Sequence, residues 1–170
     1  MSLSQPKRYI RSSIIVLGIS MLFSVSSGDQ KAANQATLNA EKMIIEAKAS
    51  APLISVTELN ELMASDQPFG LIDIRSESEF EAGYLKGAEL VTRSVLEFAI
   101  QVGALGPDKR KLVLYCRSGN RSALAIKTLL ELGFTDVRHL DGGFIAWTEA
   151  GLPFYNGLGI VKVVGTTPER

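Results

Sequence analysis

Residues 111–122 read KLVLYCRSGNRS, and this stretch decides the fold. The segment 111–115 is almost entirely apolar, as expected for a strand that is covered on both faces in a parallel sheet. A helical pattern follows over 121–132 and ends at Gly133. The polar loop between them holds the only cysteine of the chain, Cys116. The stretch therefore predicts a strand, a loop and a helix, with a thiol at the carboxyl end of the strand, where α/β sheets bind ligands.

Strand and helix patterns alternate on both sides of this unit. Short apolar runs predict further strands at 70–74, 88–91 and 137–140. A serine followed three residues later by a glutamate marks the start of three predicted helices, at Ser55 and Glu58, Ser76 and Glu79, and Ser94 and Glu97. A last helix is predicted over 144–150. Strands alternating with helices predict an α/β domain built from right-handed crossovers.

The N-terminal segment has a different composition. Its first eleven residues carry three positive charges and no negative one, an apolar run follows over 14–25, and small residues come next. This order predicts a secretory signal peptide over residues 1–27. The apolar run is shorter than the roughly 20 residues that a membrane-spanning helix needs. We therefore expect an exported protein, periplasmic if the cell is Gram-negative, that meets the membrane only during export; an uncleaved anchor over 12–27 is the alternative.

The rest of the chain divides into three parts. Residues 28–51 are rich in Ala, Lys, Glu and Gln, which predicts a helix that we interpret as a spacer. Residues 52–154 form the predicted folded domain. Residues 155–170 are a tail that either pairs along a sheet edge or stays loose.

Composition argues against several classes of protein. The 18 basic and 18 acidic residues balance, and no basic tract is present, so we expect no nucleic-acid partner. With one cysteine and one histidine, the chain lacks the ligands of a zinc site and cannot form an intramolecular disulfide. We predict neither a metal nor an organic cofactor.

The cysteine loop carries the predicted chemistry. A helix N-terminus offers unpaired N–H groups and the positive end of a dipole, which favour the thiolate form of Cys116. A small buried core cysteine is the alternative, but such a residue needs no arginines, glycine or hydroxyls around it. Cys116 is the candidate nucleophile, and the candidate substrate-binding residues are Arg117, Ser118, Gly119, Asn120, Arg121, Ser122 and, after the strand at 88–91, Arg93.

Two other sets of polar residues have structural interpretations. Asp73 and Arg75, at the end of the strand at 70–74, are expected to form an ion pair that braces neighbouring loops near the site. His139 has no partner near it in sequence and is interpreted as a packing or surface residue rather than a base.

The chain from about 54 to 153 resembles a rhodanese homology domain. Three motifs carry the resemblance: LIDIRSESEFEAGYLKGA at 71–88, LVLYCRSGNRS at 112–122 and LLELGFTDVRHLDGGFIAWTEAGLP at 129–153. The resemblance implies a three-layer domain with a five-stranded parallel sheet flanked by helices. It also implies sulfur transfer from a small anionic donor, thiosulfate or a persulfide, to a thiol acceptor through a persulfide on Cys116. Tyr84 stands where the family commonly has histidine, and we expect no loss of activity from this difference.

Two other functions remain as alternatives. The first is a rhodanese-like domain that only binds a partner, although such domains usually lack the cysteine. The second is a cysteine-based phosphatase or arsenate reductase. Phosphatases of the related fold place an arginine six positions after the cysteine, whereas Arg121 lies five positions after Cys116. The shorter loop favours sulfur transfer.

Overall fold

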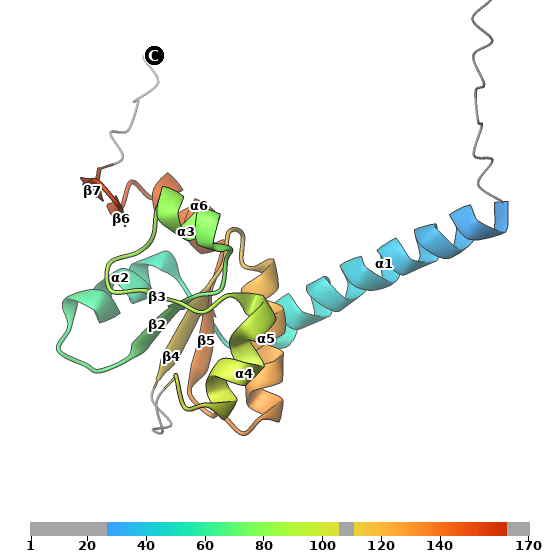
Figure 1. Cartoon of the computed structure of the whole chain (residues 1–170), viewed down its shortest axis with the longest axis horizontal. Coiled ribbons are helices and arrows are strands. Elements are labelled where there is room, and N and C mark those ends of the chain that lie inside the picture. The colour runs from blue at the N-terminus through green and yellow to red at the C-terminus, as the bar shows by residue number, and fades with distance from the viewer. Residues whose placement is uncertain (1–26, 106–110, 163–170) are drawn as a thin grey trace, which may run out of the picture.

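The computed structural model describes residues 27–105 and 111–162 (Figure 1). In chain order, the elements are α1 (Ser27–Ser50), β1 (Leu53–Ile54), α2 (Val56–Ala64), β2 (Gly70–Asp73), α3 (Glu77–Ala82), β3 (Glu89–Leu90), the 3₁₀ turn η1 (Arg93–Val95), α4 (Leu96–Gln101), β4 (Leu112–Tyr115), α5 (Asn120–Glu131), β5 (Val137–Leu140), α6 (Gly143–Glu149), β6 (Phe154–Asn156) and β7 (Gly159–Val161).

The main sheet has five parallel strands in the order β1-β5-β4-β2-β3. The central strand β4 is buried along its whole length, because helices cover both faces of the sheet. One apolar cluster packs the end of α1, α4 and α5 against the sheet, and the second packs α2 and α6 against the other face. The predicted α/β class and its three-layer, five-stranded form are thus confirmed.

Two of the three predicted helix starts are confirmed. The Ser55 and Ser76 hydroxyls each accept a hydrogen bond from the backbone N–H three residues on, and the glutamates at those positions bond back. The third prediction is wrong. Ser94 lies inside η1, and the carboxylate of Glu97 accepts two hydrogen bonds from Arg93, at 2.7 and 3.0 Å, instead of capping a helix.

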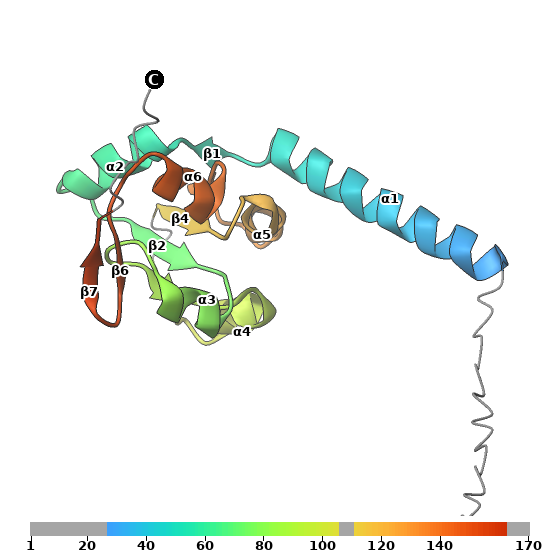
Figure 2. The same cartoon turned by 90° about the horizontal axis from the view of Figure 1, so that it is seen from above.

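Helix α1 docks on the domain only by its C-terminal end. Ala47 and Ala51 are buried there, and α1 contacts α5. The other end points away from the domain, as Figures 1 and 2 show, and Leu38 is exposed. A helix of 24 residues is about 36 Å long, so its free part extends well beyond the sheet. Its role as a spacer stays a prediction.

The N-terminal prediction lies mainly outside the described residues. The apolar run of the predicted signal peptide falls within residues 1–26, whose structure is not described. Among the described residues, no helix is both long enough and apolar enough to span a bilayer.

The C-terminal segment differs from both alternatives drawn from the sequence. Strands β6 and β7 pair with each other in an antiparallel hairpin, and a backbone bridge joins Tyr155 to Tyr84. Tyr84 also stacks on Phe80, with ring centroids 4.4 Å apart. The hairpin begins at Phe154, so the predicted boundary after residue 154 cuts through its first strand.

Candidate active site

Cys116 lies directly after the central strand β4, at the base of α5. Its exposed fraction is 1%. The hydroxyl of Ser122, in the first turn of α5, lies 3.6 Å from Sγ and donates to it. The same hydroxyl lies 3.1 Å from the carbonyl oxygen of Gly119. The sulfur therefore lies beside the first turn of α5, and Cys116 is also part of the apolar cluster that packs α1, α4 and α5 against the sheet.

The carbonyl groups of this loop are fixed by α6. The N–H of Phe144 donates to the Cys116 carbonyl at 2.8 Å, and the N–H of Ile145 donates to the Arg117 carbonyl at 3.0 Å. In a planar trans peptide the N–H points opposite to the C=O. The N–H groups of Arg117 and Ser118 therefore point away from α6.

Two glycines allow this arrangement. Gly119 precedes α5 with φ +88°, a left-handed conformation that glycine adopts at little cost. Gly143, at the start of α6, has φ +61°, and a Cβ there would lie 2.5 Å from the Cys116 carbonyl oxygen. A side chain at Gly143 would thus force the loop and α6 apart.

The loop offers an array of hydrogen-bond donors. Among the residues that the structure describes, no protein acceptor receives a hydrogen bond from the backbone N–H groups of residues 117–122. Several of these groups belong to the first turn of α5, where the helix dipole is positive. Unpaired N–H groups at a helix N-terminus are the kind of donors that hold anions in proteins, so the loop is a candidate anion site beside the cysteine.

The predicted anion-binding arginines differ in their partners. Arg121 donates to both carboxylate oxygens of Glu79, at 2.9 and 2.8 Å, and Arg93 donates to Glu97. Arg117 is exposed and forms no ion pair with any described residue. The positive charges of Arg121 and Arg93 are therefore partly balanced, whereas that of Arg117 is not.

The other predicted loop residues occupy different environments. Ser118 is exposed, Asn120 is half-buried, and Gly119 and Ser122 are buried. The structure brings Cys116, the loop and Arg121 together at one end of the sheet. Their roles toward a substrate stay predictions.

Glu79 is a site residue that the sequence analysis missed. The spacing of Ser76 and Glu79 indicates only a helix cap, because the partner of Glu79 in the site, Arg121, lies 42 residues away in sequence. The hydrogen bond from Arg121 lowers the pKa of the Glu79 carboxyl to about 2. Glu79 thus joins the cap of α3 to the first turn of α5 and fixes the direction of Arg121.

Changing Glu79 to Gln should reduce the pH dependence of stability. The lowered pKa means that the carboxylate stabilises the fold fully above its usual value of 4.5 and loses this contribution as the pH falls toward about 2. Because the side chain is partly exposed, we expect the wild type to lose about 1 kcal/mol more than the variant between about pH 5 and about pH 2. Urea unfolding at several pH values measures the difference.

The matched control is Glu97→Gln, which removes the carboxylate of an exposed ion pair within one helical segment. Its loss of stability should be small, because both side chains of that pair are more than a third exposed. Identical curves for wild type and Glu79→Gln would contradict a coupled Glu79 and Arg121.

Asp73 and Arg75 form a buried ion pair next to the site. Arg75 Nη2 lies 2.6 Å from Asp73 Oδ2, and the exposed fractions of the two side chains are 4% and 0%. Arg75 also donates to the Gly83 carbonyl and lies 4.3 Å from the centroid of the Phe144 ring. The pair thus ties the end of β2 to the segment after α3 and to α6, as the structural interpretation expected.

His139 is a packing residue, but an unusual one. It is buried in β5, and neither of its ring nitrogens has a hydrogen-bond partner among the described residues. Nδ1 lies 3.8 Å from the position that a Cβ on Gly119 would take, so the ring sits under the cysteine loop. Burial lowers the pKa of His139, which favours the neutral imidazole.

An open hollow of about 310 Å³ lies at the carboxyl end of the sheet. It is lined by residues that follow β2 and β3 and by the start of α5. Its lining residues are Ile74, Arg75, Ser76, Glu77, Thr92, Arg93, Ser94 and Arg121. Within the described residues, no group of three or more His, Cys, Asp or Glu could hold a metal ion.

The fold and the site together define a class: an α/β domain with a cysteine at the end of its central strand, beside a loop of free amides. Residues 55–150 match the sequence model of the rhodanese-like domain. The chain belongs to this family.

Known proteins agree with this assignment. The chain is 34% identical over 105 residues to a protein of Mycobacterium tuberculosis named probable adenylyltransferase/sulfurtransferase MoeZ. The matched region is 62% of the chain but only 26% of that protein, so the chain spans about a quarter of this relative's length. It is also 34% identical over 112 residues to the human thiosulfate:glutathione sulfurtransferase, with coverage of 59% and 96%.

A solved structure from Rhodopseudomonas palustris is similar too. Its TM-score is 0.58 with 36% identity, and the match covers 67% of the chain and 92% of that protein. It is described as a protein of unknown function and possible tyrosine phosphatase.

Proposed function

We propose that the protein is a sulfurtransferase that carries sulfane sulfur as a persulfide on Cys116. The observation that carries the proposal is the position of the sulfur, at the carboxyl end of β4 beside a loop whose amides have no protein acceptor among the described residues. Such amides can hold both the anionic donor and the outer sulfur of a persulfide. The names of the two sequence relatives support the same class of reaction.

The first half-reaction loads the cysteine. The Cys116 thiolate attacks the outer sulfur of thiosulfate, a new sulfur–sulfur bond forms, and the bond to the sulfonate group breaks. Sulfite leaves with the electron pair of that bond, and a persulfide anion remains on Cys116. The amides of the loop and Arg117 stabilise the negative charge of the donor and of the leaving group.

The second half-reaction unloads the cysteine. A thiol acceptor attacks the outer sulfur, the bond to Cys116 Sγ breaks, and its electron pair returns to Cys116 as a thiolate. The acceptor leaves as a hydropersulfide that keeps its proton. The two steps share no ternary complex, so ping-pong kinetics are expected.

A phosphatase is the second candidate, since the similar structure from R. palustris is described as a possible tyrosine phosphatase. Two observations oppose it. Only four residues separate Cys116 from Arg121. Asp73, at the end of the neighbouring strand, has both carboxylate oxygens bonded to Arg75 and is not free to act as a general acid.

Intact-mass spectrometry tests the proposal. The full-length protein incubated with thiosulfate should gain about 32 Da, the mass of one sulfur atom, and lose it again on addition of cyanide. Peptide mapping should place the added sulfur on Cys116. No adduct, combined with turnover of an aryl phosphate, would replace this proposal with the phosphatase. No adduct and no turnover would favour a binding module.

We propose in addition that residues 1–27 direct export and are then removed, on the basis of their charge and apolar pattern. Protein isolated from its own cells should then lack the mass of this segment. A full-length mass in the membrane fraction would favour the anchor over residues 12–27 instead.

A further inference from the structure

His139 is a buried titratable residue that the proposed mechanism does not use. It is the only histidine of the chain, and its exposed fraction is 0%. Neither of its ring nitrogens has a hydrogen-bond partner among the described residues. A buried polar ring without partners is disfavoured relative to an apolar side chain of similar size. Packing alone therefore does not explain a histidine at this position.

The ring lies on the same face of the sheet as the cysteine. Side chains two residues apart in a strand share a face, so His139 points to the same side as Val137. Val137 belongs to the apolar cluster that also contains Leu114 and Cys116. His139 is in register with Leu114 on one neighbouring strand and with Leu53 on the other. The histidine and the cysteine thus lie in one layer, between the sheet and the helices α1 and α5.

One part of the cover over the ring is the cysteine loop. Nδ1 of His139 lies 3.8 Å from the position of a Cβ on Gly119, the residue that precedes α5. On its other side the loop is held by α6, where the N–H of Phe144 donates to the Cys116 carbonyl. Because Gly119 lies so close to the ring, solvent can reach the ring from this side only if the loop moves.

The other part of the cover comes from the end of α1 and the residues after it. Ala47 belongs to the same apolar cluster, and Lys48 acts electrostatically on the ring. The N–H of His139 donates to the Pro52 carbonyl at 2.9 Å. All three of these covering residues precede the segment 55–150 that matches the rhodanese-like domain. This part of the cover therefore lies outside the matched domain.

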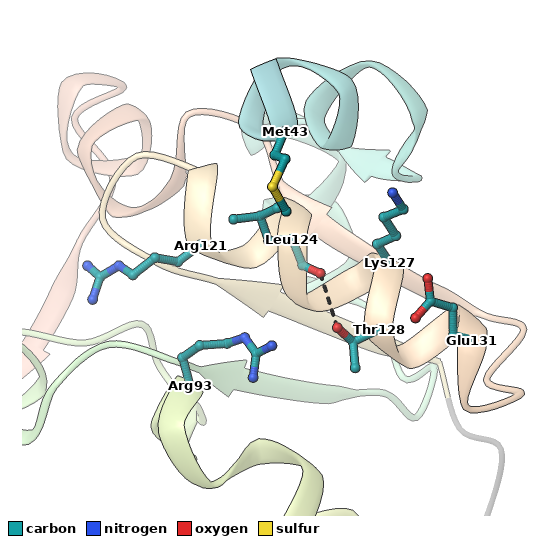
Figure 3. A pocket seen from close by; sticks show the side chains of 7 residues that line it. All are labelled: Met43, Arg93, Arg121, Leu124, Lys127, Thr128 and Glu131. Carbon is teal, nitrogen blue, oxygen red and sulfur yellow. Dashed lines mark hydrogen bonds between the residues drawn. The ribbon is translucent and has the colours of Figure 1, made fainter. Parts of the chain in front are cut away.

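The end of α1 is attached to the domain by few buried contacts. Met43 points toward Leu124 of α5, as Figure 3 shows, but its exposed fraction is 61%. Among residues 28–50, only Ala47 is buried. An alanine side chain buries little apolar area, and elements with few buried contacts open at a lower free energy than the core of a sheet. The end of α1 can therefore leave the domain without unfolding it.

The surroundings of the ring oppose a positive charge on it. Burial, which has the largest influence, and Lys48 lower the pKa of His139, while the Leu140 carbonyl and Asp141 act in the opposite direction without offsetting them. Cys116 is a further titratable group on this face of the sheet. Strand β1 carries no charged residue, and the residues that α5 buries are all uncharged. The folded arrangement therefore favours the neutral imidazole.

We propose that His139 is a pH-sensing positioning residue whose neutral ring holds the cysteine loop on one side and the end of α1 on the other, and that protonation of the ring releases both. A charged imidazole needs water or acceptors, and the ring can reach water only by displacing one of these two covers. The inference goes beyond the proposed function, because it concerns how the loop is held and needs no sulfur donor.

Proton linkage determines the sign and the size of the effect. The pKa of an exposed histidine is about 6.5, and that of the buried ring is lower. The closed arrangement is therefore fully favoured above about pH 6.5, and it loses this advantage as the pH falls below that value. Between about pH 7.5 and about pH 5.5, the population of the open state should rise by a factor of up to about ten.

Hydrogen exchange of the full-length protein at these two pH values tests the proposal, with each rate divided by that of an unstructured chain at the same pH. The N–H of Ala51, which donates to the Ala47 carbonyl, reports on the end of α1, and the N–H of Phe144 reports on the loop. The protection of both should be about fivefold to tenfold lower at the acid pH. The N–H of Ser65, at the end of α2 on the opposite face of the sheet, is the control and should not change.

Two variants identify the group that titrates. His139→Leu keeps a side chain of similar size and removes the proton site, so its protection at the two reporter groups should be the same at both pH values. At about pH 7.5 it should equal that of the wild type within about twofold, since neither ring nitrogen makes a hydrogen bond with a described residue that leucine would lose. Cys116→Ser removes the thiol of the same layer and should keep the full response of the wild type.

A measurement on the wild type keeps the proposal testable if His139→Leu does not fold. Because the chain has one histidine, the imidazole resonances in an NMR titration belong to His139 without further assignment. They should titrate below about pH 6.5. Titration at or above that value would mean that the ring is already exposed or paired, and the proposal would be wrong.

The other outcomes are equally decisive. Equal protection at the two pH values in the wild type, or the same loss in His139→Leu, would overturn the role of the histidine. A loss at Ala51 without one at Phe144 would show that the ring holds α1 but not the loop, which also contradicts the proposal. Failure to form a persulfide on Cys116 would overturn the proposed function and would leave these exchange results unaffected.

Discussion

Changing Cys116 to serine should reduce transfer of sulfur from thiosulfate to cyanide below about a thousandth of the wild-type rate, because a serine hydroxyl is not ionised at neutral pH and cannot hold sulfur as a persulfide. The structure gives this variant a clear interpretation. Serine is slightly smaller than cysteine, and the Ser122 hydroxyl, 3.6 Å from Sγ, is a polar group close to the position of the new hydroxyl. A standard thiosulfate:cyanide assay measures the loss.

Stability separates a chemical effect from a structural one. The free energy of unfolding should fall by no more than about 2 kcal/mol in Cys116→Ser, since one buried sulfhydryl is replaced by a hydroxyl of similar size with the Ser122 hydroxyl close by. Thermal melts and circular dichroism check that the fold is kept. A Cys116→Ser variant that folds and still transfers sulfur would contradict the mechanism.

Changing Asp73 to alanine should destabilise the domain by about 3–5 kcal/mol, because it leaves the buried guanidinium of Arg75 without its counter-ion. Arg75 is only 4% exposed and cannot recover its hydration where it lies. Its remaining partners, the Gly83 carbonyl and the rings of Phe144 and Tyr115, do not carry a negative charge. Denaturant unfolding monitored by Trp147 fluorescence measures the change.

The exposed pair of Arg93 and Glu97 provides the comparison. Both side chains are more than a third exposed, so Glu97→Ala should cost less than about 1 kcal/mol. A similar small cost for Asp73→Ala would mean that Arg75 finds solvent when its partner is removed. The bracing role of the pair would then be wrong.

Much of the fold could be predicted because its signals are local. The apolar run at 111–115 indicates a strand covered on both faces, and β4 is the central, fully buried strand. The spacing of Ser55 and Glu58 indicates a helix start because the two residues bond to each other's backbone. The position of Cys116 after β4 follows from the same local pattern.

Other features could not be predicted because they depend on residues far apart in the chain. Strand β1 has only two residues, too few for any pattern, and exists through its pairing with β5. Ser94 and Glu97 have the spacing of a cap, but Arg93 competes for the carboxylate. The bond between Arg121 and Glu79 crosses 42 residues. Helix α1 contacts α5, and the sequence of neither helix predicts that contact.

In the proposed mechanism, the hydrogen bonds from α6 to the carbonyls of Cys116 and Arg117 determine how the loop presents its amides to the donor. The folded chain orients these peptide planes before an anion binds. The conformational entropy of the loop is therefore lost once, during folding, and not in every turnover. A rigid receptor of this kind discriminates by fit. A donor that cannot align its sulfur with the fixed amides gains nothing from adjustment of the loop, and only small anions of matching shape should react quickly.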